Sequence, residues 1–182
     1  MNSTTISIKN LFFKKEISRL EDAMQYIHQL PYGRNADRAN YMLVLEEEKG
    51  TCSTKHALLK AFAMELGEDK VQLFLGVYKM MEENTPGIGK VLDASPLNYI
   101  PEAHCYLKVE GKRVDLTSQN ADISKVEKGL LEEQEILPDD IGDYKVNYHK
   151  NFIRNWLKME YPELTFEEVW QLREACIAAL SQ

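Results

Sequence analysis

Apolar residues recur with helical spacing near both ends of the chain and cluster as in strands near its middle. Residues 16–30 carry apolar side chains three or four positions apart, which predicts an amphipathic helix: Ile17, Leu20, Met24, Ile27 and Leu30. Pro31 and Gly33 in "PYGRN" then mark a turn. Residues 38–47 fit a short helix or a strand, so the pattern leaves this segment open.

The most apolar helix is predicted over residues 52–66. Its "ALLKAFAM" stretch has a single charge in eight residues, and Gly67 suits the conformation that often ends a helix. A helix that is apolar on most sides is normally buried among other elements. The next stretch, "VQLFLGVYKM", is rich in β-branched and aromatic residues and predicts a strand.

Two further strands are predicted on either side of a tight turn. "AHCYLKV" and "KRVDLTS" flank Glu110-Gly111, a dipeptide suited to a two-residue hairpin turn. The prolines and glycines of residues 82–101 predict a long loop before this hairpin. Past residue 120 the pattern is helical again, apart from a polar interruption at 138–142, and Thr165 and Glu168 have capping-box spacing. Helices, a short antiparallel sheet and helices again predict an α+β fold.

Composition and charge narrow the class of protein. With 182 residues, 44% hydrophobic and 28% charged, we expect one soluble globular domain over residues 1–182. The net charge of −7 argues against nucleic acid as a partner. No apolar run is long enough to span a membrane, and "MNSTTISIKNLFFKKE" lacks the apolar core of a secretory signal, so no membrane partner is expected. Three widely spaced cysteines favour a reducing, cytoplasmic location over a disulfide framework.

Cys52 is the first candidate for chemistry because it begins the buried helix. The helix dipole and the unpaired N–H groups of a first turn favour a thiolate, and a cationic partner can lower the thiol pKa from about 8.5 to roughly 3.5–7.5. Such a thiolate would attack a carbonyl, and the N–H groups would hold the developing oxyanion. The plainer alternative is a small residue packed at a helix start, since free cysteine is commonly buried.

The hairpin offers a base for this nucleophile. If Glu110-Gly111 forms the turn, His104 and Asp115 point to the same face as a diagonal pair, with α-carbons about 7–8 Å apart. Asp115 would then fix the tautomer of His104 and stabilise its charged form. A register change of one residue would send the two side chains to opposite faces. Taken singly, His104 fits an ordinary core or surface histidine, and Asp115 a solvated acid near a turn.

These residues resemble the transglutaminase-like superfamily of cysteine enzymes, which has a papain-like Cys-His-Asp arrangement. Gly50-Thr51-Cys52 is similar to the Gly-x-Cys that begins the family's central helix, "HCYLKV" to its His-x-aromatic strand, and "VDLT" to its strand ending in Asp-x-Thr. The resemblance covers about residues 50–118. It implies a central buried helix that starts at the cysteine and packs on a small antiparallel sheet, with flanking N- and C-terminal helices. It also implies catalytic roles for Cys52, His104 and Asp115.

The chain departs from the family pattern in the length of the hairpin and in the residue at position 56. The hairpin is shorter than usual by an even number of residues on each side, which preserves the facing of His104 and Asp115. His56 stands where the family commonly has a small residue, and four positions after Cys52 it shares that residue's helical face. His56 is therefore a candidate modulator of the thiol, with packing as the plainer role. Lys55 is a second candidate modulator, although a lysine is normally expected to be exposed.

The remaining polar and cysteine residues have weaker claims. Tyr32, Asn35 and Tyr41 are candidates for a second oxyanion donor, but nothing in the sequence places any of them. Cys105 follows His104 on its strand, so it faces the other side and is expected in the core. Cys176 lies on the apolar stripe of the last helix, which favours packing.

The leading hypothesis is a cysteine-dependent acyl-transfer enzyme working through a thioester on Cys52, by amide or peptide hydrolysis or by transamidation. Its substrate would be a peptide, a protein or a small amide, with no cofactor and no metal. The alternative is a catalytically silent transglutaminase-like fold that binds a peptide or protein. A metal site using Cys52, His104 and a nearby acid is less favoured, because no other compactly spaced ligand occurs.

Overall fold

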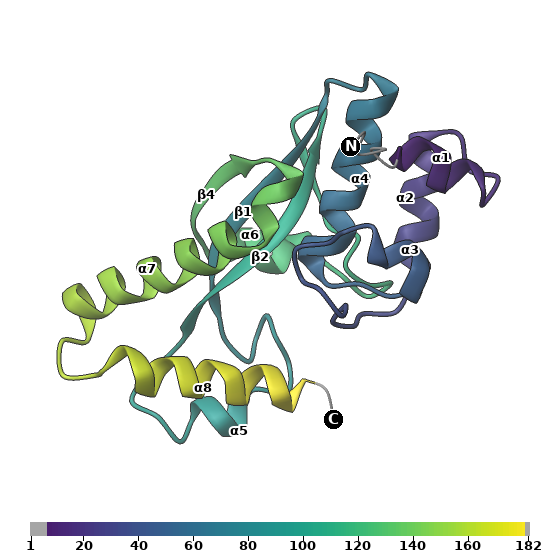
Figure 1. Ribbon diagram of the computed structural model, residues 1–182. Coiled ribbons are helices and arrows are strands. Elements are labelled where there is room, and N and C mark those ends of the chain that lie inside the picture. Colours follow the sequence, from purple (N-terminus) through teal and green to yellow (C-terminus); the bar gives the residue numbers. More distant parts are fainter. Residues whose placement is uncertain (1–6, 181–182) are drawn as a thin grey trace, which may run out of the picture. The chain divides into compact units, whose positions relative to one another are not determined.

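The computed structural model describes residues 7–180 (Figure 1). Residues 1–6, part of the stretch in which no secretory signal is expected, and residues 181–182 lie outside the described part. Within residues 7–180, no helix has the length and apolar character needed to cross a membrane.

The described residues form both helices and strands, and the predicted α+β class is confirmed. The helices are α1 (Ile8–Phe13), α2 (Leu20–Gln29), α3 (Leu43–Glu47), α4 (Cys52–Leu66), α5 (Gly89–Leu92), α6 (Ile123–Lys128), the 3-10 helix η1 (Pro138–Ile141), α7 (Asp143–Glu160) and α8 (Phe166–Ala179). The strands are β1 (Val71–Met80), β2 (Ile100–Val109), β3 (Lys112–Val114) and β4 (Leu130–Ile136).

The four strands form one antiparallel sheet in the order β3-β2-β1-β4. β2 and β3 make the predicted hairpin, in which Val109 pairs with Lys112. Glu110 and Gly111 have φ angles of 50° and 81°, the left-handed values that a type I′ turn requires at both central residues. The register on which the His104–Asp115 prediction depends is therefore confirmed.

The helical pattern predicted after residue 120 is wrong for β4. The sequence of this strand, LLEEQEI, is rich in Glu and Gln, which have low strand propensity, and its apolar residues do not alternate. The strand order places β4 at an edge of the sheet, next to β1. Pairing with β1 therefore determines its conformation, and that long-range interaction leaves no local pattern in the sequence.

The N-terminal helical region is also divided differently from the prediction. The helix expected over residues 16–30 begins at Leu20, and the separate helix α1 precedes it. Glu16 has a φ of 62°, a left-handed conformation that interrupts helical geometry between α1 and α2. The segment 38–47, left open by the pattern, contains α3.

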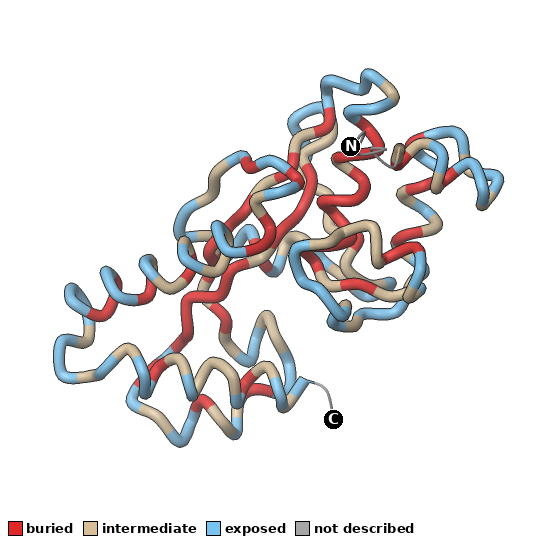
Figure 2. The backbone as a smooth tube through the Cα atoms, viewed as in Figure 1, coloured by how far each residue is buried: buried red, intermediate tan, exposed pale blue. Residues whose placement is uncertain are grey.

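The predicted bounds of the central helix α4 are confirmed. Thr51 caps its N-terminus: the Thr51 hydroxyl accepts from the N–H of Thr54, and the Thr54 hydroxyl accepts from the N–H of Thr51. Gly67 ends the helix with a φ of 79°. α1, α2, α3 and η1 all contact α4. Most residues of α4 are consequently buried, as the colouring of the backbone in Figure 2 shows.

The described residues group into two compact units, and neither is continuous in sequence. Unit 1 contains the chain up to Leu75 with His104–Ile123 and Gln134–Lys145; unit 2 contains Gly76–Ala103, Ser124–Glu133 and the chain from Val146 onward. Every residue predicted to form the site belongs to unit 1. The expectation of a single domain stays a prediction.

Unit 2 has a buried ion pair and a buried thiol. Nε and Nη2 of Arg173 donate to the two carboxylate oxygens of Glu102 at 2.7 and 2.5 Å. Cys176 is fully buried on α8, which agrees with the packing role predicted for it. The capping box of Thr165 and Glu168 at the start of α8 is confirmed.

Candidate active site

Cys52 is the first residue of α4, and only 9% of it is exposed. The capping box of Thr51 and Thr54 begins the helix at this position. The aligned peptide dipoles of α4 therefore place partial positive charge next to the thiol, together with N–H groups of the first turn. The prediction that Cys52 begins a buried helix is confirmed.

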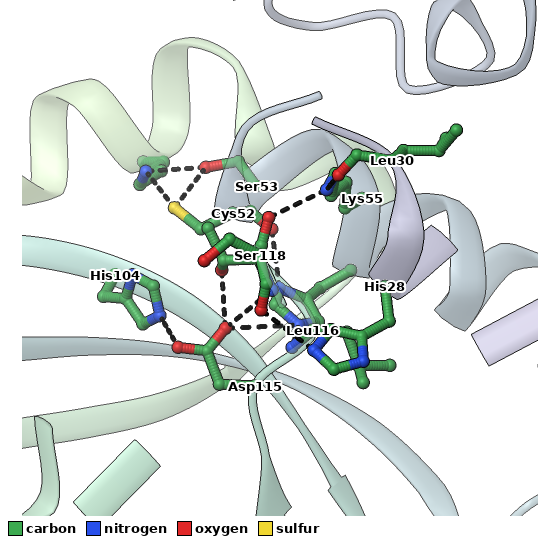
Figure 3. Close-up of polar contacts among 12 residues, drawn as sticks. His28, Leu30, Cys52, Ser53, Lys55, His104, Asp115, Leu116 and Ser118 are labelled. Carbon is green, nitrogen blue, oxygen red and sulfur yellow. Dashed lines mark hydrogen bonds and ion pairs between the residues drawn. The ribbon is translucent and has the colours of Figure 1, made fainter. Parts of the chain in front are cut away.

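β2 carries His104, and Asp115 immediately follows β3. Nε2 of His104 lies 2.8 Å from Oδ2 of Asp115 in a hydrogen bond (Figure 3). Oδ1 of Asp115 accepts from the backbone N–H and the hydroxyl of Thr117, at 2.9 and 2.5 Å. The structure thus brings His104 and Asp115 together, and both oxygens of the carboxylate have partners that fix its orientation.

The Cys52 thiol and the His104 imidazole are electrostatically coupled, and each favours the charged form of the other. Burial raises the pKa of the thiol, but the positive charges of Lys145 and His104 outweigh it and lower the pKa from 9.0 to about 6. Burial lowers the pKa of His104, while the charges of Asp115 and Cys52 raise it well above its ordinary value. For Asp115, burial is outweighed by His104, and its pKa falls well below the usual range. At neutral pH these pKa values favour a thiolate beside an imidazolium.

Lys145 is a site residue that the sequence reasoning missed. It lies in the first turn of α7, and its Nζ donates to the Ser53 hydroxyl at 2.6 Å. The same Nζ lies 4.0 Å from the Cys52 sulfur. Lys145 is 93 residues from Cys52 in the chain. A single lysine in a polar stretch belongs to no motif, so the sequence does not predict its contact with Cys52. Only the tertiary structure places its charge beside the thiol.

His56 contacts the backbone of Cys52 rather than its sulfur. Its Nδ1 lies 2.7 Å from the Cys52 carbonyl oxygen, and its Nε2 accepts from the N–H of Leu116 at 2.8 Å. An N–H can only donate, so Nε2 carries the lone pair and Nδ1 the proton. Burial is the main reason that the pKa of His56 falls to about 4, against an opposing effect of Asp115. His56 is therefore a neutral, fully buried histidine with a defined tautomer.

Lys55 is fully buried, contrary to the exposed position expected for it. Its Nζ donates to the backbone oxygens of Leu30 and Thr117 at 2.5 and 2.8 Å. Burial lowers its pKa to about 8, although the charge of Asp115 acts in the opposite direction. The ammonium group thus satisfies two backbone carbonyls, and the cation close to the sulfur is Lys145 instead.

Asn35, one of three candidates for a second oxyanion donor, is engaged at the start of α4. Its Nδ2 donates to the Glu47 carboxylate at 3.1 Å and to the Lys49 carbonyl oxygen at 3.0 Å. Its Oδ1 accepts from the hydroxyl of Thr54 at 2.8 Å. These bonds make Asn35 a support for the capping box of α4 and give its amide N–H groups acceptors other than a substrate oxyanion.

The two tyrosine candidates are placed by other interactions. Tyr41 lies beside Asp139, and burial, together with the charge of that carboxylate, raises its pKa. The backbone of Tyr32 forms an isolated parallel bridge with Gly50, and the residue is 55% exposed. These contacts assign the oxyanion to neither tyrosine.

His104 thus interacts with the Asp115 carboxylate through a hydrogen bond and with the Cys52 thiol through charge, and a thiol coupled to an imidazole is the combination that nucleophilic catalysis uses. Cys105, the next residue after His104, is fully buried, and burial raises its pKa.

Within residues 7–180, no group of three or more His, Cys, Asp or Glu side chains is placed to hold a metal ion. In comparisons with known proteins, no family model, curated protein or solved structure matches the chain.

Proposed function

We propose that this protein is a cysteine-dependent acyl-transfer enzyme, with Cys52 as nucleophile, His104 as acid and base, and Asp115 as the group that orients His104. The observation that carries the proposal is the 2.8 Å bond between His104 and Asp115 beside a thiol whose pKa is about 6. A thiol with its ordinary pKa is only slightly ionised at neutral pH, whereas this one is mainly thiolate. Such a site has both the nucleophile and the proton donor that acyl transfer needs.

The proposed reaction has two stages. The thiolate forms a bond to the carbonyl carbon of an amide or peptide, and the π electrons of the carbonyl move to its oxygen. When the carbonyl reforms, the C–N bond breaks, and the His104 imidazolium gives its proton to the departing amine. This leaves a thioester on Cys52. Water attacks the thioester carbonyl while His104 takes its proton, and the C–S bond then breaks, which releases a carboxylic acid and restores the Cys52 thiolate beside the His104 imidazolium. An amine in place of water completes transamidation.

The same residues support membership of the transglutaminase-like superfamily, with α4 as its central helix and the β2–β3 hairpin as the strands that carry His and Asp. The substrate on this proposal is a peptide, a protein or a small amide. A cytoplasmic location is part of the proposal, because a catalytic thiol needs a reducing environment and all three cysteines are free.

The test is the pH dependence of alkylation by iodoacetamide, with mass spectrometry used to separate the three cysteines. Cys52 should react with an apparent pKa of about 6. Cys105 and Cys176 are internal references, because burial raises the pKa of both thiols. His104→Ala should raise the apparent pKa of Cys52, since it removes a positive charge that stabilises the thiolate.

The alternative, a silent fold that binds a peptide or protein, predicts a different profile. Cys52 would then react only above about pH 8, at a rate unchanged in His104→Ala. That result, in a protein with an unaltered circular dichroism spectrum, would overturn the proposed enzyme.

A further inference from the structure

The Lys145 ammonium is held by the Ser53 hydroxyl and is directed at the Cys52 sulfur. Its Nζ donates to the Ser53 hydroxyl at 2.6 Å and lies 4.0 Å from the Cys52 sulfur. Resting on the acyl-transfer function above, we propose that the Lys145 ammonium binds the oxyanion that forms when Cys52 attacks a carbonyl. Lys145 would then be the second oxyanion donor for which the sequence offered only Tyr32, Asn35 and Tyr41.

The separation of the two atoms suits this role. An effective oxyanion donor lies about 2.7–3.1 Å from the position that the charged oxygen will occupy. In the tetrahedral intermediate this oxygen is attached to the carbon bonded to the sulfur, so it lies beside the sulfur and not on it. An ammonium 4.0 Å from the sulfur leaves room for the oxygen between the two groups. A donor in direct contact with the sulfur would have to move away before the substrate could react.

The charge balance of the reaction leads to the same assignment. In the resting site the positive charge of Lys145 helps to stabilise the thiolate. During attack the negative charge leaves the sulfur and appears on the carbonyl oxygen, and the new C–S bond leaves the sulfur neutral. The N–H that is directed at the sulfur can turn to the oxygen while the bond to Ser53 holds the ammonium nearby. A partly buried ammonium therefore keeps an anionic partner through both states.

The two other cations of the site, Lys55 and His104, cannot bind the oxyanion in this way. Lys55 has its Nζ committed to the backbone oxygens of Leu30 and Thr117. His104 has to give its proton to the leaving amine, so its charge is lost in the first stage of the reaction. Lys145 keeps its charge throughout, which suits it to stabilise the oxyanion in both stages.

Two reagents separate oxyanion binding from simple stabilisation of the thiolate. Iodoacetamide is attacked at a saturated carbon and forms no oxyanion, whereas 4-nitrophenyl acetate reacts through a tetrahedral intermediate that has one. Both rates are proportional to the fraction of Cys52 that is ionised. The ratio of the acylation rate to the alkylation rate at one pH therefore does not depend on that fraction. We expect Lys145→Met to lower the ratio of acylation to alkylation by on the order of 10²-fold, the usual effect of losing one oxyanion donor.

Matched variants complete the experiment. Lys158→Met removes an exposed lysine from the same helix, α7, and should leave the ratio at the wild-type value. Lys145→Arg keeps the charge and should retain more of the ratio than Lys145→Met. Ser53→Ala removes the hydroxyl that positions Nζ and should give an intermediate loss. If Lys145→Met is unfolded by circular dichroism, Ser53→Ala decides the question, because a wild-type ratio in that variant would overturn the proposal.

The outcomes distinguish this role from the function on which it rests. A wild-type ratio equal to that of N-acetylcysteine amide would mean that the site gives no help to acyl transfer, and both proposals would fail. A wild-type ratio well above that reference, unchanged in Lys145→Met, would overturn the oxyanion role alone. A high wild-type ratio that falls in Lys145→Met, but not in Lys158→Met, is the expected result.

Discussion

The backbone N–H of Leu116 donates to Nε2 of His56, so the segment that carries Asp115 is tied directly to the helix that carries Cys52. Lys55, the neighbour of His56, makes a second tie through its bond to the Thr117 carbonyl oxygen. Two adjacent residues of α4 thus bind two adjacent residues that follow Asp115. Cys52 and Asp115 are far apart in the chain, and these bonds hold the two segments that carry them against each other.

His56→Gln should change how stability depends on pH. The pKa of His56 is lowered to about 4 from 6.5, so between these values the unfolded chain binds a proton that the folded protein does not. Wild-type stability therefore falls as pH drops from 6.5 towards 4. Glutamine cannot titrate, so His56→Gln should not lose this stability as pH falls. Near neutral pH, His56→Gln should be less stable than wild type by about 1–3 kcal/mol, because glutamine forms these hydrogen bonds imperfectly.

Urea unfolding at a series of pH values measures this difference. The free energy of unfolding of wild type minus that of His56→Gln should be largest near neutral pH and should shrink by a few kcal/mol towards pH 4. The slope of the free energy against urea should be equal in the two proteins, which checks that the unfolded states are comparable. A difference that stays constant with pH would contradict a neutral, buried His56.

The parts of the site that lie on regular elements were predictable from the sequence. Cys52 follows a capping residue and precedes an apolar run, both of which are local signals. The facing of His104 and Asp115 depends only on the turn at Glu110-Gly111 and on the alternation of side chains along a strand. These relations extend over few residues, so tertiary packing had little opportunity to change them.

The parts that failed depend on distant contacts. Lys55 is a long charged side chain for which exposure is the normal expectation, and its burial depends on two carbonyl groups from separate loops. The pattern predicts a helix where β4 lies because its Glu- and Gln-rich sequence has a low strand propensity. Pairing with β1 in the sheet outweighs that local propensity. Lys145 reaches the thiol through the folding of a segment with no recognisable motif. None of these relations leaves a pattern that a single sequence reveals.

Asp115→Asn should weaken the site while largely keeping the fold. The amide can still contact Thr117, but it removes the negative charge that helps to raise the pKa of His104. A less stable imidazolium in turn stabilises the thiolate less, so the apparent pKa of Cys52 should rise from about 6. Acylation by 4-nitrophenyl acetate at neutral pH should fall by about 10²–10⁴-fold, because the carboxylate also fixes the tautomer of the imidazole.

The alkylation profile of Cys52 and the acylation rate should be measured together in this variant. Asp69→Asn is the matched control, since it removes an exposed carboxylate from the same unit and should behave as wild type. If Asp115→Asn kept the wild-type acylation rate and the wild-type profile, the carboxylate would have no part in orienting His104.

Arg173→Met should strongly destabilise the protein through the ion pair of unit 2. Arg173 binds Glu102 through two hydrogen bonds, and the two side chains are only 15% and 10% exposed. Removing one partner of a buried pair leaves an uncompensated charge and typically costs about 3–5 kcal/mol. His149 lies 4.0 Å from the same carboxylate and can compensate only when it is protonated.

Comparing the free energies of unfolding of three variants separates the contribution of charge from that of packing in the Arg173–Glu102 pair. Arg173→Met combined with Glu102→Gln should recover part of the stability lost in Arg173→Met, because no buried charge then remains unpaired. Arg154→Met makes the same substitution at an exposed arginine of α7, which covers the Phe166 ring and donates to the Asn151 side chain at the surface. It should cost no more than about 1 kcal/mol. Equal losses in Arg173→Met and the double variant would mean that packing of the guanidinium, and not neutralisation of Glu102, is what stabilises unit 2.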